Sequence, residues 1–245
     1  MATEIRDKIA DYCRNRANEI NILKYSRYFK EGLYDGFGLT ASQINDGAKK
    51  LAKLPDLSLR IMLDTIPDII KTGKYEEISI AMLIVKKYHK EFSKETFRQI
   101  ALWYKYGINN WAHADTLGMI ILPVFLQKEI INVTDFAGWL KSQNKFQRRS
   151  VPVTLIKILK MHQDIKELFA FIECLMTDPE REVHQGTGWF LREAWKKYPA
   201  ETEEFLTKWK DEAPRLIYQY ATEKMTPEAK TRFKKQKLTA NNNDR

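Results

Sequence analysis

Apolar residues recur along most of the chain at the three- and four-residue spacing of an amphipathic helix. Residues 4–18 carry one such stripe, and the spacing returns in residues 44–52 and 97–104. Alternation of apolar and polar residues over the length of a strand is missing. The pattern therefore predicts an all-α protein with about twelve to fourteen short helices.

The predicted helix starts are polar residues followed by acids or proline. Such N-cap patterns stand at Ser93, Thr134, Thr177 and Thr226. Helices this short and numerous do not fit a bundle of four long helices, but they fit an array of helix pairs that bury their faces against one another. We therefore predict an α-solenoid with a concave groove. It forms one domain over residues 1–228, and a basic, partly disordered tail follows over 229–245.

Composition narrows the class of protein. The 245 residues are 44% hydrophobic and include only 10 Gly and 8 Pro, which excludes collagen-like and largely disordered chains. The two cysteines, Cys13 and Cys174, are too few for a disulfide framework or a zinc cluster. The longest apolar run, residues 118–126, is shorter than the roughly 18 residues of a membrane-spanning helix, and the N-terminus lacks the apolar core of a signal peptide. We expect a soluble, cytoplasmic protein, and nothing in the sequence indicates an obligate dimer.

The net charge of +9 is concentrated in the predicted tail. The charged residues there are Lys230, Arg232, Lys234, Lys235, Lys237 and Arg245, with Asp244 as the acid. Two interpretations stay open at this point. The tail either binds a polyanion without reading its sequence, or it is a solubilising end.

Several common motifs fail on inspection. The sequence Gly36-Phe37-Gly38 is a lone GxG with no strand before it, so it does not support a dinucleotide-binding fold. His89-Lys90-Glu91 matches half of a zinc deaminase signature, but the cysteine half is missing. The four histidines have no partner at metal-ligand spacing. No metal or organic cofactor is predicted.

The spacing of one tryptophan and one aspartate allows either a structural or a catalytic interpretation. Trp111 and Asp115 are four residues apart, so on a helix they share one face. An aspartate near the start of a helix is favoured by the macrodipole, and the tryptophan would then be ordinary core. Spacing alone favours this structural interpretation over a site.

Several short segments that occur in a fixed order favour a functional site instead. The segment GWFLREAWKKYP at 188–199 resembles the G-W-x-L-R-E signature of the AlkD-type DNA alkylation repair glycosylases, which are built from HEAT-like repeats. The other blocks with a counterpart in that family are SRYFKEG at 26–32, residues 37–50, NNWAHAD at 109–115, SQNKFQRRSV at 142–151, and Ala213-Pro214. They occur in the family's order, and the resemblance covers roughly residues 20–215.

The resemblance implies an enzyme that hydrolyses the N-glycosidic bond of alkylated purines in double-stranded DNA. Its catalytic aspartate falls on Asp115, and its two lesion-facing tryptophans fall on Trp111 and Trp189. Its conserved arginine falls on Arg149 and its DNA-facing tyrosine on Tyr28. We expect Trp111, Asp115, Arg149 and Trp189 to line one groove, with Asp115 partly accessible and outside any closed ion pair.

Some positions depart from the family pattern. Met119 stands where family members usually have proline, and Thr40-Ala41-Ser42 replaces a loop that often carries an amide and a proline. Pro152 follows Arg149 by one helical turn and should kink its helix. Lesion preference and excision therefore stay open. Two alternatives remain: a relative that binds DNA structure without excising a base, and a HEAT-type scaffold for other proteins.

Overall fold

Every regular element in the described part of the chain is a helix, as the periodicity predicts. The computed structural model describes residues 2–29, 34–72, 74–161 and 164–234. Among these residues, no helix is long and apolar enough to cross a membrane. The chain divides into two compact units, residues 1–158 and 159–245, and each is described by itself. The predicted single domain over 1–228 stays a prediction.

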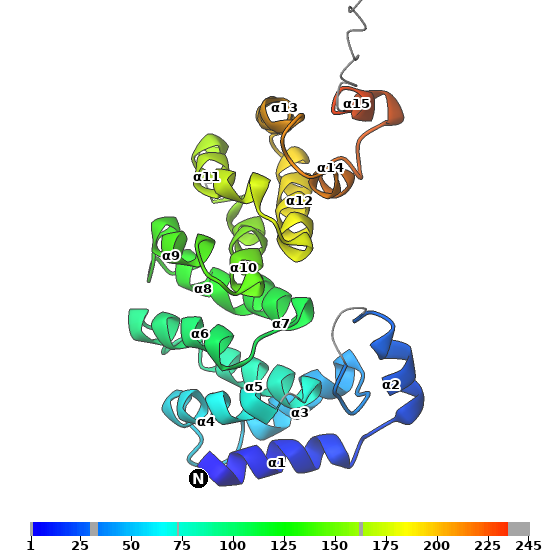
Figure 1. Cartoon of the computed structure of the whole chain (residues 1–245). Coiled ribbons are helices and arrows are strands. Elements are labelled where there is room, and N and C mark those ends of the chain that lie inside the picture. The colour runs from blue at the N-terminus through cyan, green and yellow to red at the C-terminus, as the bar shows by residue number, and fades with distance from the viewer. Residues whose placement is uncertain (1, 30–33, 73, 162–163, 235–245) are drawn as a thin grey trace, which may run out of the picture. The chain divides into compact units, whose positions relative to one another are not determined.

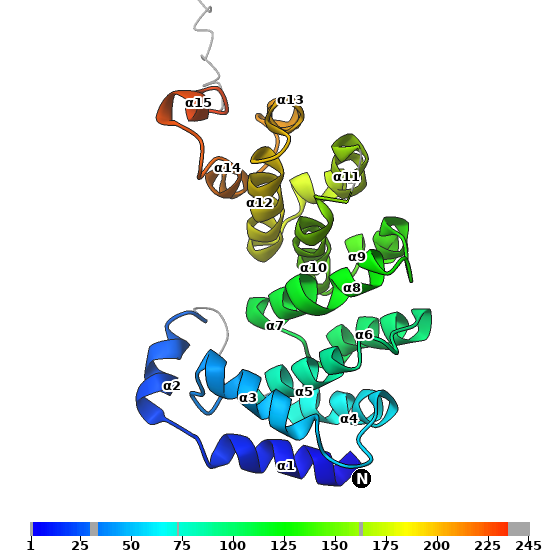
Figure 2. The ribbon, with the colours of Figure 1, turned by 180° about the vertical axis from the view of Figure 1, so that it is seen from behind.

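The first unit contains ten α-helices in its described residues (Figures 1 and 2). They are α1 (Ala2–Arg14), α2 (Glu19–Ser26), α3 (Ala41–Leu51), α4 (Leu59–Thr72), α5 (Tyr75–Lys87), α6 (Lys94–Tyr106), α7 (Trp111–Thr116), α8 (Leu122–Gln127), α9 (Ala137–Leu140) and α10 (Lys145–Leu155). A π-helical turn, η1 (Leu117–Ile121), joins α7 to α8.

Helix α5 lies at the centre of the first unit. It packs against α1, α3 and α4 and also contacts α7. Its apolar residues Ile80, Ala81 and Met82 are completely buried, and the two acids of its first turn, Glu76 and Glu77, are buried as well. A helix that is apolar on nearly all sides must be surrounded by other helices, so α5 forms the core on which the others assemble.

Two of the four predicted helix starts are confirmed, and two are wrong. Ser93 caps α6 and Thr226 caps α15 (Pro227–Thr231), each accepting a hydrogen bond from the third helical N–H. Thr134 lies inside a short 3-10 turn that Asn132 precedes. Thr177 ends another 3-10 turn, and the next helix begins only at Arg181. In that segment the Asp178 side chain accepts a hydrogen bond from the Glu180 N–H at 2.9 Å, and it delays the helix by one turn.

The second unit is built around α12 (Arg181–Trp195), which lies against α14 (Arg215–Ala221). Its other helices are α11 (Ile165–Ile172), α13 (Pro199–Trp209) and α15. A Cβ on Gly188 would lie 2.7 Å from the carbonyl oxygen of Ile217, so only glycine lets the two helix backbones approach this closely.

The described part of the predicted basic tail is folded. Phe233 is only 1% exposed, and its carbonyl oxygen accepts a hydrogen bond from Arg215 Nη1 at 2.7 Å. Arg232 forms an ion pair with Glu203 at 2.8 Å. The folded part of the second unit therefore continues past Glu228 to at least residue 234, and residues 235–245 of the predicted tail lie outside the described residues.

Candidate active site

Trp111 and Asp115 lie on α7, a short helix whose start is fixed by a side-chain cap. The Asn110 side chain accepts a hydrogen bond from the His113 N–H at 2.9 Å, which sets the first turn. Trp111 is the first residue of the helix and is 38% exposed. Asp115 follows one turn later, so the predicted placement of the two on one helix is confirmed.

Asp115 forms a two-point ion pair with Arg149 of α10. Arg149 Nε donates to Asp115 Oδ1 and Nη2 donates to Oδ2, both at 2.8 Å. The Asp115 side chain is 15% exposed, and the Arg149 side chain is 7% exposed. The expectation that Asp115 stands outside a closed ion pair is therefore wrong. A nearly buried guanidinium needs an acceptor, and the parallel fork of Arg149 matches both oxygens of the carboxylate.

Helices α7 and α10 approach one another closely behind this ion pair. The Ser150 hydroxyl lies 3.2 Å from the Ala114 carbonyl oxygen and 2.5 Å from the Tyr104 hydroxyl, and both hydroxyl side chains are buried. Asn144 caps α10 and also donates to the Tyr104 carbonyl oxygen at 2.9 Å. Buried hydrogen bonds thus tie α6, α7 and α10 together and fix the distance over which Asp115 meets Arg149.

Gly118, three residues after Asp115, makes this approach sterically feasible. A Cβ at this position would lie 2.8 Å from Val153 Cγ1 and 3.2 Å from the Ser150 carbonyl oxygen. The Gly118→Ala variant is expected to lose about 1–3 kcal/mol of unfolding free energy, because η1 and α10 must move apart. Urea unfolding of the purified variant measures this loss.

Gly138 of α9 supplies the control for that substitution. A Cβ there meets nothing within 4 Å, so Gly138→Ala should be neutral or slightly stabilising. If the two alanine variants unfold at the same urea concentration, the close approach at Gly118 has no energetic importance.

His113 holds α7 against α5 as a neutral group. Its Nδ1 lies 2.8 Å from Asn110 Nδ2, which can only donate, and its Nε2 lies 3.0 Å from the Tyr75 carbonyl oxygen, which can only accept. The hydrogen therefore resides on Nε2. Burial lowers the pKa of His113 to about 4, so at neutral pH it adds no positive charge two residues from Asp115.

The indole of Trp111 is supported by aromatic rings from the N-terminal part of the unit. Phe29 stacks on Trp111 with ring centroids 5.6 Å apart and 22° between the planes. Trp111 Nε1 donates to the carbonyl oxygen of Tyr28 at 3.4 Å. Tyr28, the predicted DNA-facing tyrosine, is 63% exposed. Within the first unit the structure thus brings Tyr28 beside Trp111 and Arg149 beside Asp115, while residues 30–32 of the SRYFKEG block lie outside the described residues.

Trp189 belongs to the second unit, on α12, and is half-buried. Its neighbour Arg192 pairs with Glu193 at 3.1 Å and also with Glu223, so this arginine links α12 to the segment after α14. The predicted convergence of Trp189 with Trp111, Asp115 and Arg149 stays a prediction.

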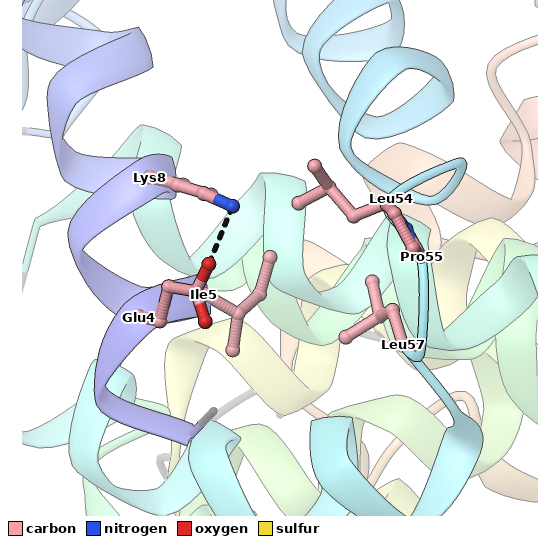
Figure 3. A pocket seen from close by; sticks show the side chains of 6 residues that line it. All are labelled: Glu4, Ile5, Lys8, Leu54, Pro55 and Leu57. Carbon is pink, nitrogen blue, oxygen red and sulfur yellow. Dashed lines mark hydrogen bonds and ion pairs between the residues drawn. The ribbon is translucent and has the colours of Figure 1, made fainter.

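Three pockets of the first unit are lined by other residues. Figure 3 shows a small pocket between α1 and the segment after α3, where Lys8 and Glu4 pair at 2.7 Å. None of the five predicted site residues lines it. Within the described ranges, no cluster of three or more His, Cys, Asp or Glu side chains has the arrangement of a metal site.

Three comparisons with known proteins bear on this arrangement. A search of curated proteins finds no match. Among solved structures, the chain is similar to a predicted DNA alkylation repair enzyme from Enterococcus faecalis, with a TM-score of 0.72 and 17% identity over 86% of this chain and 98% of that one. At this identity the likeness is one of fold, and it confirms the predicted all-α, solenoid class. The family model described as DNA alkylation repair enzyme matches residues 12–225. Because this match spans most of the 245 residues and confirms the predicted resemblance, the chain belongs to the DNA alkylation repair enzyme family.

Proposed function

We propose that this family member is a DNA glycosylase that hydrolyses the N-glycosidic bond of purines alkylated at N3 or N7 in double-stranded DNA. One observation carries the proposal. The Asp115 carboxylate is held at both oxygens by Arg149, yet it keeps part of its surface accessible and lies one helical turn from the exposed Trp111. A carboxylate fixed in this way can stabilise a positive charge that develops beside it without first having to reorient.

The chemistry suits a single acid. Alkylation at N3 or N7 leaves a positive charge on the purine, so the departing base is neutral and no general acid has to protonate it. The sugar that remains develops positive charge in the transition state, as in other glycoside hydrolyses. Asp115 stabilises that charge and orients the attacking water.

The other residues would bind the damaged nucleotide. The indole faces of Trp111 and Trp189 attract a cationic base through cation–π contacts of about 0.5–2 kcal/mol each. Tyr28, exposed beside Trp111, contacts the DNA. Arg149 acts mainly by holding Asp115, because two of its nitrogens donate to that carboxylate. The phosphate contact that the family resemblance implies for Arg149 is then secondary.

The closed ion pair also favours one alternative function. A carboxylate paired at both oxygens is suited to a structural role, as in a relative that binds DNA without excising a base. The two functions differ in one measurable property, which is the release of free base from DNA.

The test uses the full chain and three duplexes of one sequence, which contain N7-methylguanine, a neutral hypoxanthine or no lesion. We expect release of the methylated base alone, measured by chromatography of the free base. Binding to all three duplexes without release would support the non-catalytic relative. Release of hypoxanthine would show that a general acid is present and would contradict the proposed chemistry.

The C-terminal basic residues are expected to add affinity without specificity. Deleting residues 235–245 removes Lys235, Lys237 and Arg245 together with Asp244. Binding should weaken equally for methylated and undamaged duplexes, and the salt slope should become shallower by no more than about three. Fluorescence anisotropy at several salt concentrations measures both quantities.

A longer deletion serves as a structural comparison. Removing residues 229–245 also removes Phe233, which is 1% exposed, so this variant should melt at a lower temperature. If the shorter deletion leaves both affinity and salt slope unchanged, residues 235–245 do not contact phosphates.

A further inference from the structure

The GxG segment that fails as a dinucleotide motif encloses a carboxylate of the protein itself. We call residues 34–39 the glycine loop. Three consecutive N–H groups of this loop donate to Glu76 of α5: that of Phe37 to Oε2 at 2.7 Å, and those of Gly38 and Leu39 to Oε1 at 2.9 and 3.1 Å. The Tyr34 hydroxyl also donates to Oε1. Successive backbone N–H groups of this kind form an anion-binding nest, and here the anion is Glu76.

Both glycines of the loop are needed for this arrangement. A Cβ on Gly36 would lie 2.6 Å from Glu76 Oε2. Gly38 has a φ of +75°, and a Cβ there would lie 2.3 Å from the Asn18 carbonyl oxygen. A side chain at either position would collide with the carboxylate or with the start of α2. The glycine loop is therefore shaped around Glu76.

Glu76 is completely buried, and its charge is balanced by hydrogen bonds. In the part of the chain that the structure describes, no Lys or Arg pairs with it. Burial raises the pKa of Tyr34, and the hydrogen bond to Glu76 raises it further, so the Tyr34 hydroxyl stays protonated and donates. Hydrogen bonds to a charged group in such surroundings are stronger than neutral ones.

The glycine loop fixes the start of α2. The Asn18 N–H donates to the Phe37 carbonyl oxygen at 2.8 Å, and Asn21 Nδ2 donates to the Gly38 carbonyl oxygen at 3.0 Å. Helix α2 has no buried residue, so little apolar packing holds it in place. These polar contacts with the loop therefore decide where α2 lies.

The same loop supports Trp111 through a series of rings. Tyr34 stacks on Phe29 with centroids 5.3 Å apart, and Phe29 in turn stacks on Trp111. Tyr75, next to Glu76 in the chain, contacts both Tyr34 and Phe29 and stacks on His113. Contacts thus connect the Glu76 carboxylate through Tyr34 and Phe29 to the indole of Trp111.

We propose that Glu76 is a positioning residue of the site: by binding the glycine loop it sets α2, Tyr28 and the Phe29 ring that supports Trp111. This inference rests on the proposed function for its effect on lesion binding. Its effect on the loop itself can be measured without DNA.

The test is the Glu76→Gln variant, examined by hydrogen exchange in the absence of DNA. The amide presents an NH₂ group where the wild type has an acceptor, so at least one loop N–H loses its partner. We expect exchange at the amides of residues 37–39 and 19–26 to rise by a factor of roughly ten or more. Affinity for the methylated duplex should fall by more than the rate of release at saturating enzyme.

Glu77→Gln is the matched control. Glu77 is the next residue of α5 and is also buried, but its side chain accepts a hydrogen bond from the Thr72 hydroxyl at 3.4 Å, whereas the N–H groups of the glycine loop donate to Glu76. This variant should leave exchange in residues 37–39 unchanged. Equal changes in the two variants, or protection of the loop amides in Glu76→Gln, would overturn the proposal.

Two milder variants cover the case in which Glu76→Gln does not fold. Tyr34→Phe removes one donor to Glu76 and keeps the ring that stacks on Phe29, so it should raise loop exchange by a smaller factor. Glu76→Asp keeps the charge and should recover part of the protection. If neither variant alters exchange in residues 37–39, Glu76 does not control the loop. If the wild type releases no base, the exchange results still decide the proposal, because they do not depend on excision.

Discussion

Replacing Asp115 with asparagine is expected to lower the release of methylated purines by a factor of at least roughly 10² while the affinity for DNA stays nearly the same. Asparagine has almost the same size as aspartate but lacks the charge that would stabilise the sugar cation. Release under single-turnover conditions at saturating enzyme, together with binding to the methylated duplex, measures the two quantities separately. The same substitution at Asp68, which is exposed and pairs with Lys71 at 3.2 Å, is the control.

The ion pair adds a complication that a second variant resolves. Asp115→Asn removes the charge that the nearly buried Arg149 faces across this ion pair, which is expected to cost several kcal/mol of stability. Adding Arg149→Met removes both charges and should recover stability without recovering release. Release by the stable double variant would show that Asp115 is structural. A cooperative melt in each variant is required for either conclusion.

Arg149→Gln is expected to lower the unfolding free energy by about 3–5 kcal/mol, because it leaves the Asp115 carboxylate without its guanidinium partner. Release of methylated base should fall with it, since the carboxylate loses its fixed orientation. DNA affinity and its salt slope should change little. Denaturant unfolding, single-turnover release and a salt titration of binding measure these three effects.

Arg148→Gln provides the adjacent comparison. Arg148 is half-buried and donates to the Ser142 carbonyl oxygen at 2.7 Å, so the same change occurs one residue away from the ion pair. It should cost much less stability and leave release intact. If instead Arg149→Gln weakens DNA binding and reduces the salt slope by about one, Arg149 contacts a phosphate as the resemblance implies.

Periodicity was sufficient to predict the class of fold but not the bounds of its helices. The N-cap patterns at Ser93 and Thr226 locate the starts of α6 and α15, because a cap is a local interaction. At Thr177 the local pattern is the same, yet Asp178 binds a different N–H and the helix starts later. Competition between neighbouring polar side chains decides such starts, and spacing does not reveal it.

The pairing of Asp115 with Arg149 does not follow from the sequence, and the grouping of the five predicted residues in one site stays a prediction. Asp115 and Arg149 come from helices far apart in sequence, and their ion pair depends on the close packing that Gly118 permits. Glu76 was missed because an acid in the first turn of a helix is an ordinary feature. The signal that was available is its position beside an almost wholly apolar segment, where a charge needs partners from elsewhere in the fold.

The π-helical turn η1 begins two residues after Asp115 and contains Met119, the position at which the family resemblance implies a proline. In this turn the Leu122 N–H donates to the Leu117 carbonyl oxygen, five residues back, so the turn contains one residue more than an α-helical turn. Losing a single residue here would rotate α8 relative to α7 by about 100° and carry Asp115 away from Arg149. The number of residues between Asp115 and Pro123 therefore matters to the site in addition to their side chains, of which Leu117, Gly118 and Ile121 are buried.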